Sequence, residues 1–276
     1  MRAIVVDRDG HPRLSDVPEP EGEVVRVLAC GLCGSDVEKL GPDAAGTVLG
    51  HEVVAEADGQ RVALVHHLPC GECERCLAGH DSTCEQFRAA TIVPGGFSER
   101  VAATGGWTAL PDGISSELGT YAEPLACVLR GAERVPAGDV LVLGGGFVGT
   151  LFAAVLRRRG GLVHVFDSDP GRSDGPAERR FPTVVLAAPA DPLPHVEPGG
   201  SVLVFAPAPP LDLERVYRDE ITVSGSRSAT PRLLEAAVAL LPTLDLPEPV
   251  VLPLERIAEG LALYRERRAL KVVLTP

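Results

Sequence analysis

The stretch Asp139-Val-Leu-Val-Leu-Gly-Gly-Gly-Phe-Val-Gly149 runs from a continuous apolar segment straight into a cluster of glycines. An uninterrupted apolar run is typical of a strand that is buried on both faces of a parallel sheet. Apolar residues then recur at helical spacing until Gly160-Gly161 ends the pattern. The recurring positions are Val148, Leu151, Phe152, Val155 and Leu156. The stretch therefore predicts a strand, a glycine-rich turn and a helix in succession.

A second apolar run, residues 162–166, ends at Asp167. A G-x-G-x-x-G turn between strand and helix, with an acid roughly 20 residues later at the next strand tip, is typical of dinucleotide binding. The glycines let the backbone approach a pyrophosphate at the helix N-terminus. Asp167 can accept hydrogen bonds from the adenine-ribose diol and would repel a 2′-phosphate, which favours NAD over NADP; alternatively, Asp167 only caps the next turn. The candidate cofactor-binding residues are Gly144, Gly146, Phe147, Val148, Gly149 and Asp167.

The chain after Asp167 is too short and too polar for a complete dinucleotide-binding fold. Residues 168–180 contain two prolines and two glycines, and residues 191–200 contain three prolines, which excludes a regular helix there. Strand-like apolar runs resume at residues 183–187, 201–205 and 221–224. We therefore expect a trimmed doubly wound parallel sheet that lacks an edge strand and part of its helical cover.

The remaining segments predict a second, β-rich unit. Residues 1–65 consist of short apolar runs cut by proline and glycine, a pattern typical of a small closed or half-closed barrel. Residues 230–241 and 254–268 read as helices, with a linker at 242–253 between them. Residues 270–274 read as a closing strand, which we expect to return to the sheet of the first unit.

The strongest local pattern is C-x2-C-x2-C-x7-C. Two-residue gaps let a tight turn bring successive sulfurs to one point, and four thiolates with no open position describe a structural zinc. Four unrelated buried thiols are the alternative, and so is an iron–sulfur cluster, although the run lacks the ferredoxin-type C-x3-C-P ending. His66 and His67 precede the pattern and are interpreted as structural or solvent-facing rather than as ligands. The cysteines are Cys70, Cys73, Cys76 and Cys84.

A second metal site is suggested by scattered residues. Cys33 lies two residues before the hydroxyl of Ser35, and His51 is followed directly by Glu52; Glu123 comes much later. A thiolate, an imidazole and a carboxylate with one position open would make a catalytic zinc site, and a hydroxyl beside the metal can pass a proton. The alternative is an ordinary buried cysteine and a surface histidine.

The length, composition and net charge of the chain limit the classes of partner that it could bind. The chain has 276 residues, a formal net charge of −12 and 45% hydrophobic residues, which suits one large or two modest domains. The acidic balance argues against nucleic acid or an anionic membrane as partner. No run reaches the roughly 18 apolar residues of a membrane span, and the N-terminus carries no export signal. We expect a cytoplasmic protein, in which clustered cysteines are more often metal ligands than disulfides.

Together these motifs resemble the zinc-dependent medium-chain dehydrogenases, closest to the polyol (sorbitol/iditol) and threonine dehydrogenase branch. The matching pieces, in the family's order, are residues 31–36, 50–52, the four-cysteine pattern, 95–97, 123–127, 144–149 and 269–273. The resemblance implies two zinc ions per chain, the catalytic one held by Cys33, His51 and Glu123. It makes Glu52 a fourth or exchanging ligand and Ser35 the start of a proton relay. It places Lys271 at the pyrophosphate of NAD.

The resemblance also implies an architecture. Residues 1–122 and 246–276 would form a GroES-like zinc-binding catalytic domain, and residues 123–245 an abbreviated Rossmann domain that binds NAD. Relatives are commonly dimers or tetramers, which implies a homo-oligomer. The relay position three residues after Ser35, commonly histidine in this branch, is Glu38 here.

Three functions are compatible with these observations. The first is hydride transfer between NAD(H) and a secondary alcohol or ketone of a polyol, cyclitol or sugar-like metabolite, with zinc as Lewis acid. The second is a non-redox zinc lyase, cyclase or epimerase of a biosynthetic pathway, supported by the shortened sheet and by Glu38 as a general acid or base. The third is a non-catalytic binding protein. The substrate is a small molecule that the sequence does not identify; Phe97 and Trp107 could contact it or could complete the core.

Overall fold

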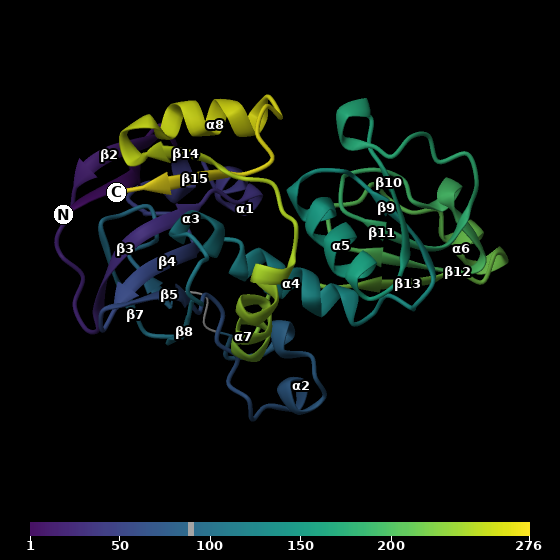
Figure 1. Cartoon of the computed structure of the whole chain (residues 1–276), viewed down its shortest axis with the longest axis horizontal. Coiled ribbons are helices and arrows are strands. Elements are labelled where there is room, and N and C mark those ends of the chain that lie inside the picture. Colours follow the sequence, from purple (N-terminus) through teal and green to yellow (C-terminus); the bar gives the residue numbers. More distant parts are fainter. Residues whose placement is uncertain (88–90) are drawn as a thin grey trace. The chain divides into compact units, whose positions relative to one another are not determined.

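Two units make up the chain in the computed structural model, which describes residues 1–87 and 91–276 (Figure 1). The first, here called the barrel unit, is assembled from residues 1–126, 229–243 and 247–276. The second, here called the parallel-sheet unit, contains residues 127–228 and 244–246.

An eight-stranded sheet forms most of the barrel unit. Its path runs β14-β15-β3-β4-β5-β8, with β7 paired to β3 and β6 paired to β7. The strands are β3 (Val24–Gly31), β4 (Glu52–Ala57), β5 (Gln60–Leu64), β6 (Ile92–Val93), β7 (Arg100–Ala103), β8 (Trp107–Ala109), β14 (Val250–Pro253) and β15 (Val272–Thr275). A separate hairpin joins β1 (Arg2–Val6) to β2 (Pro12–Asp16). Because β15 pairs with β3, the closing strand returns to this sheet as predicted.

Six α-helices of the described residues belong wholly or in part to the barrel unit. They are α1 (Gly34–Glu38), α2 (Glu74–Leu77), α3 (Ser116–Gly119), α4 (Ala122–Ala132), α7 (Pro231–Leu240) and α8 (Ile257–Arg265). Helix α8 packs on β14 and β15 (Figure 1). Helix α7 packs Leu234 and Val238 against Val54 and Ala63 of the barrel, whereas the expected boundaries placed this segment in the nucleotide-binding domain.

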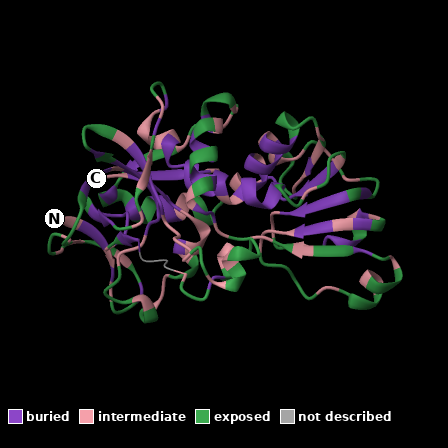
Figure 2. Cartoon of the chain, turned by 90° about the horizontal axis from the view of Figure 1, so that it is seen from below, coloured by how far each residue is buried: buried purple, intermediate pink, exposed green. Residues whose placement is uncertain are grey.

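The parallel-sheet unit contains five strands in the order β10-β9-β11-β12-β13. They are β9 (Asp139–Leu143), β10 (Leu162–Phe166), β11 (Phe181–Leu186), β12 (Val196–Val204) and β13 (Thr222–Gly225), accompanied by α5 (Phe147–Arg158) and α6 (Leu213–Arg218). All four pairings are parallel, and β9 and β11 are buried over most of their length (Figure 2). A complete doubly wound sheet has the order 3-2-1-4-5-6. This sheet follows that order without strand 3, which confirms the predicted loss of an edge strand.

Two differences from the sequence prediction concern local structure. Strand β14 lies inside the segment 242–253, which the sequence predicted as a linker; its apolar run Val250-Val251-Leu252 stands between prolines and is completed as a strand by parallel pairing with β15. Helix α4 begins at Ala122, where no helix was expected, and holds Glu123-Pro124 in its first turn, in which proline is tolerated. Among the described residues, no helix has both the length and the apolar character needed to cross a membrane.

The segment after Asp167 takes over the role of the missing strand. It forms only a 3-10 turn, η3 (Pro170–Arg172), and then runs along the free edge of β10. The Asp174 backbone amide donates to the Val165 carbonyl at 2.8 Å, and the Asp174 carboxylate accepts from the Val165 amide at 2.9 Å. The same carboxylate accepts from Arg157 Nη2 at 2.9 Å. One aspartate thus satisfies backbone groups that would otherwise leave an exposed sheet edge unpaired.

We predict that Asp174→Ala destabilises the parallel-sheet unit by about 1–2 kcal/mol, because the Val165 amide loses a charged acceptor. Thermal unfolding should show a lower transition temperature, and light scattering should show earlier aggregation through the exposed edge. Glu178→Ala, which removes an exposed acid of the same segment, is the matched control. Equal behaviour of the two variants would contradict the edge-capping role.

Candidate active site

The register of the barrel sheet brings the metal-ligand candidates together. Gly31, the last residue of β3, lies opposite Glu52, the first residue of β4. Because the strands are antiparallel, Cys33 just beyond β3 and His51 just before β4 share one end of the sheet. Val273 of β15 also lies opposite Gly31, which brings Lys271 to the same end. Residues that are far apart in the sequence therefore meet through two strand pairings.

Three of the predicted ligands form one cluster. Donor atoms of Cys33, His51 and Glu52 all lie within 4.8 Å of one another, and His51 and Glu52 are buried. A thiolate, an imidazole and a carboxylate at this spacing fit a zinc ion with room for a further ligand. Glu123, at the start of α4, is only 8% exposed, and its negative charge contributes to raising the pKa of His51. Glu123 stands outside the 4.8 Å set, so its role as a ligand stays a prediction.

Asp36 fixes the positions of both ligand-bearing segments, a role that the sequence analysis did not assign. Its Oδ1 lies 3.2 Å from His51 Nδ1 and accepts from the Gly50 amide at 3.1 Å, while Oδ2 accepts from the Cys33 amide at 3.1 Å. A carboxylate behind a ligating histidine orients the ring and strengthens it as a donor. A carboxylate three residues after Cys33, at the start of a short helix, was the available signal.

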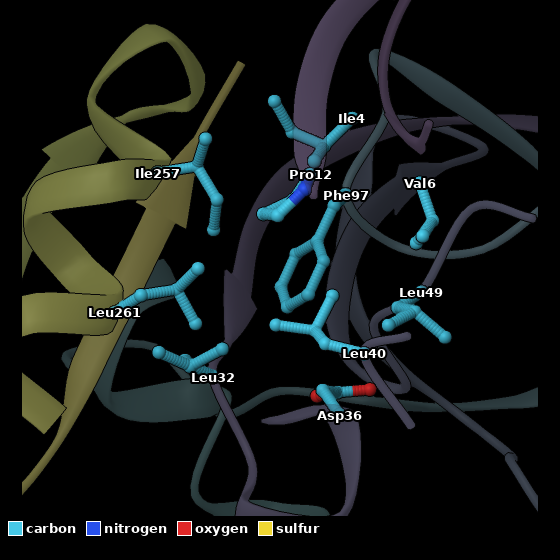
Figure 3. A pocket seen from close by; sticks show the side chains of 10 residues that line it. All are labelled: Ile4, Val6, Pro12, Leu32, Asp36, Leu40, Leu49, Phe97, Ile257 and Leu261. Atoms are coloured by element: carbon cyan, nitrogen blue, oxygen red, sulfur yellow. The ribbon is translucent and has the colours of Figure 1, made fainter. Parts of the chain in front are cut away.

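The surroundings of Asp36 make these contacts strong. Asp36 is the one charged residue lining a small cavity between α8 and the first strands, otherwise lined by Ile4, Val6, Pro12, Leu32, Leu40, Leu49, Phe97, Ile257 and Leu261 (Figure 3). Burial alone would raise the pKa of Asp36, but hydrogen bonds from His51 and two backbone amides outweigh it and lower the pKa. Burial would likewise lower the pKa of His51, whereas Asp36 and Cys33 hold it well above its usual value.

Phe97, which the sequence offered as a substrate contact or a core residue, is 2% exposed and belongs to the core cluster.

Lys271 is engaged inside the barrel unit. Its ammonium forms a buried ion pair with Glu52 Oε2 and donates to the Leu32 carbonyl at 3.2 Å. Burial would lower the pKa of Lys271, but the charges of Glu52 and Cys33 raise it, so the ammonium stays charged. The role at a cofactor pyrophosphate, which the resemblance implied, stays a prediction.

The two relay candidates lie on α1. Ser35 Oγ is 3.5 Å from Cys33 Sγ, which places the hydroxyl beside the metal cluster. Glu38 is exposed, three residues further along the same helix. Residues at this spacing share one helical face, so Glu38 lies on the solvent side of Ser35 along that face.

A row of imidazoles borders the cluster. The ring of His66 stacks on that of His51 with centroids 4.5 Å apart, and His67 lies 3.8 Å from His66. Burial and the neighbouring His51 lower the pKa of His66 to about 2, so this ring is neutral. The interpretation of His66 as structural is compatible with this packing, since its ring covers one side of His51.

The four-cysteine lobe has the geometry of a closed tetrahedral site. Its Sγ atoms all lie within 4.8 Å of one another, and three measured separations are 3.5, 3.9 and 3.9 Å. Bonds of about 2.3 Å around a tetrahedral zinc place sulfurs about 3.8 Å apart. These residues therefore fit a structural zinc. All seven cysteines of the chain are free of disulfides.

The glycine-rich turn of the parallel-sheet unit has the shape of a pyrophosphate cradle. Gly144 has φ +110°, and Gly149 packs so tightly that a Cβ would lie 1.8 Å from the Gly144 carbonyl oxygen. The space around Gly146, at the start of α5, is open. First-turn amides of a helix have no partner within the helix, so an anion can bind there. Phe147 and Val148 occupy this first turn and are half-buried.

The ribose side of the cradle is more crowded. Asp167 accepts from the amides of Gly145 at 2.8 Å and Asp169 at 2.9 Å. The Ser168 hydroxyl also donates to Asp167 Oδ1 at 3.5 Å, so one of the roughly four acceptor positions of the carboxylate remains for a ribose hydroxyl. The carbonyl oxygen of Arg172 lies over Gly145, only 2.0 Å from where a Cβ would be. The abbreviated segment therefore rests on the turn, and the cradle fits a dinucleotide at its open Gly146 side.

Comparison with known proteins extends over both units. Residues 19–112 match the alcohol dehydrogenase GroES-like domain. The chain is 29% identical over 182 residues to the L-galactonate-5-dehydrogenase of Escherichia coli K12, covering 59% of this chain and 54% of that protein. It is 34% identical over 193 residues to the L-arabinitol 4-dehydrogenase of Aureobasidium melanogenum, covering 59% and 52%. The chain thus spans about half the length of the curated relatives it matches.

Solved structures match along the whole chain. One, described as a zinc-binding dehydrogenase from Sinorhizobium meliloti 1021 and bound to NADP, has a TM-score of 0.83 at 23% identity and covers 100% of this chain and 99% of that one. The chain therefore has the fold of the zinc-dependent medium-chain dehydrogenases, and its residues 19–112 carry their GroES-like domain. An acetophenone reductase from Geotrichum candidum in complex with NAD has a TM-score of 0.85 at 19% identity, covering 100% and 97%. As in the medium-chain dehydrogenases, a GroES-like barrel accompanies a Rossmann-like sheet, which confirms the predicted fold class.

We predict that Asp36→Asn lowers zinc affinity at the Cys33–His51–Glu52 cluster about 10- to 100-fold, because the ring of His51 loses its charged partner. The zinc content, measured after dialysis against a weak chelator, should fall from two ions per chain toward one. The four-cysteine lobe is the internal control and should keep its metal. Retention of both ions would contradict this role.

Proposed function

We propose that the chain is a zinc-dependent oxidoreductase that transfers hydride between NAD(H) and a secondary alcohol or ketone of a polyol, cyclitol or sugar-like metabolite. The cluster of Cys33, His51 and Glu52 beside the Ser35 hydroxyl carries this proposal. Both curated relatives described above are named as sugar-acid or polyol dehydrogenases, which favours hydride transfer over the non-redox alternative.

When bound, a catalytic zinc would supply Lewis acidity at the substrate oxygen, and NAD would supply the hydride acceptor. Cys33 and His51 would hold the metal, with Glu123 as the predicted third ligand. Asp36 keeps the His51 ring oriented. The Lys271 ammonium holds Glu52 by charge, so the carboxylate can approach or leave the metal without becoming an unpaired buried charge.

The proton of the alcohol leaves through the chain's own side chains. Ser35 Oγ accepts it while releasing its own hydrogen outward, so the hydroxyl stays neutral overall. Exposed Glu38 then accepts the proton or exchanges it with water. Hydride leaves the same carbon, so each turnover removes one hydride and one proton from the alcohol.

The cofactor in this proposal is NAD, and the lobe of four cysteines holds a structural zinc. Asp167 supports NAD because its charge disfavours a 2′-phosphate. Solved structures of this fold carry either dinucleotide, so the choice rests on Asp167.

The proposal also includes a cytoplasmic location, a homo-oligomer and no nucleic-acid or membrane partner. The free cysteines are compatible with a reducing compartment.

Replacing Cys33 by Ala should abolish NAD-dependent oxidation of a polyol panel while NADH binding, followed by fluorescence, stays unchanged. The thiolate contributes to the metal site and not to the glycine cradle. Cys30→Ala, which changes a buried thiol of the neighbouring strand, is the matched control. Full turnover by Cys33→Ala, or no NAD(H) binding by the native chain at millimolar concentration, would overturn the proposal.

Asp167→Ser should weaken NAD binding roughly 10- to 100-fold, because a charged acceptor for the ribose is lost. The preference for NAD over NADP should shrink with it. Calorimetric titration with both dinucleotides measures the two affinities, and Asp169→Ser is the control in the same turn. An unchanged ratio would show that Asp167 only organises the turn.

A further inference from the structure

Tyr264, near the end of α8, reaches the start of α1. A Cβ at Gly34 would lie 2.6 Å from Tyr264 Oη and 3.7 Å from Cζ. The tip of the phenol therefore rests on the backbone between Cys33 and Ser35. Any side chain at position 34 would push the hydroxyl away, so glycine there is required for this contact.

The hydroxyl of Tyr264 is available to a ligand. Within residues 1–87 and 91–276 it makes no hydrogen bond, although its ring is partly buried, with 36% of the residue exposed. Burial, together with the charges of Cys33 and Glu38, raises the pKa of Tyr264, so the O–H is retained at neutral pH. A phenol of this kind can donate one hydrogen bond and accept another.

Two other oxygen groups stand on α1 near this contact. Ser35, directly after Gly34, places its Oγ beside Cys33 Sγ, and Glu38, four residues after Gly34, lies on the helical face that Tyr264 covers. A carboxylate accepts hydrogen bonds from hydroxyls, and a phenol can donate to them. This combination suits a ligand that carries a second hydroxyl next to the one held at the metal, whereas an alkyl group offers neither side chain a hydrogen bond.

We propose that Tyr264 Oη and the Glu38 carboxylate form a subsite for the hydroxyl adjacent to the reacting carbinol, so that the chain selects vicinal diols over simple secondary alcohols. The inference rests on the proposed function, since it names the feature of the substrate that this site recognises. Tyr264 binds substrate in this scheme and takes no part in hydride transfer.

A matched pair of probes tests the subsite: butane-2,3-diol and butan-2-ol, which differ by one vicinal hydroxyl. With the zinc-loaded chain and NAD, Tyr264→Phe should lower the ratio of kcat/KM for the diol to that for butan-2-ol by roughly 3- to 10-fold, the effect of one neutral hydrogen bond. Gly34→Ala should lower the same ratio, because its Cβ displaces Oη. Tyr217→Phe, at a tyrosine that is 82% exposed on α6, is the control and should leave the ratio unchanged.

Calorimetry without nucleotide separates this inference from the proposed function. The zinc-loaded native chain should bind the diol more tightly than butan-2-ol, and Tyr264→Phe should remove that difference while the melting temperature and zinc content stay native. If neither probe is oxidised but the binding difference depends on Tyr264, the subsite stands and the dehydrogenase proposal fails. Equal binding of both probes by the native chain, or an unchanged ratio in Tyr264→Phe, overturns the subsite.

Discussion

The antiparallel pairing of β3 with β4 is the constraint on which the candidate active site depends. It sets Gly31 opposite Glu52 and so places Cys33 and His51 at one end of the sheet. A slip of one residue would turn each side chain of β4 to the opposite face, moving Glu52 away from the cluster and exchanging Val53 and Val54 between the two core clusters that β4 separates. The packing of β4 thus specifies the metal site as well as the barrel. Chemistry and packing are fixed by the same register.

A buried network of charges reinforces this geometry. Asp36 bonds to the segment before α1 and to the segment before β4, while Lys271 from β15 neutralises Glu52. Each of these side chains is almost fully buried, and each has either a partner of opposite charge or a polar hydrogen-bond partner. A buried charge without such a partner costs several kcal/mol, so loss of any one member would leave another uncompensated. The network therefore acts as a unit and holds the ligand candidates Cys33, His51 and Glu52 in place.

Sequence reasoning succeeded where the signal was local. The apolar runs of β9 and β10 and the helical spacing of α5 predicted their elements closely, and the cysteine spacing predicted a cluster that the structure assembles. It failed where the determinant is a contact across the fold. The run Val250-Val251-Leu252 of β14 is too short to predict a strand without its partner β15, and the roles of Asp36 and Tyr264 follow from partners distant in sequence. Lys271 was assigned by resemblance, and its ion pair with Glu52 becomes visible only once β15 is placed beside β3.

The division of the barrel unit into three chain segments has a consequence for its biosynthesis. Strand β15 lies between β3 and β14, yet it is made after the whole parallel-sheet unit. While the chain emerges from the ribosome, the Cys30–Gly31 end of β3 lacks β15, and Glu52 lacks its counter-ion, until residues 271–275 have emerged. The four-cysteine lobe, in contrast, is complete once residue 84 has emerged. The two metal sites therefore become able to mature at different times, first the lobe and then, once β15 has been made, the Cys33 cluster.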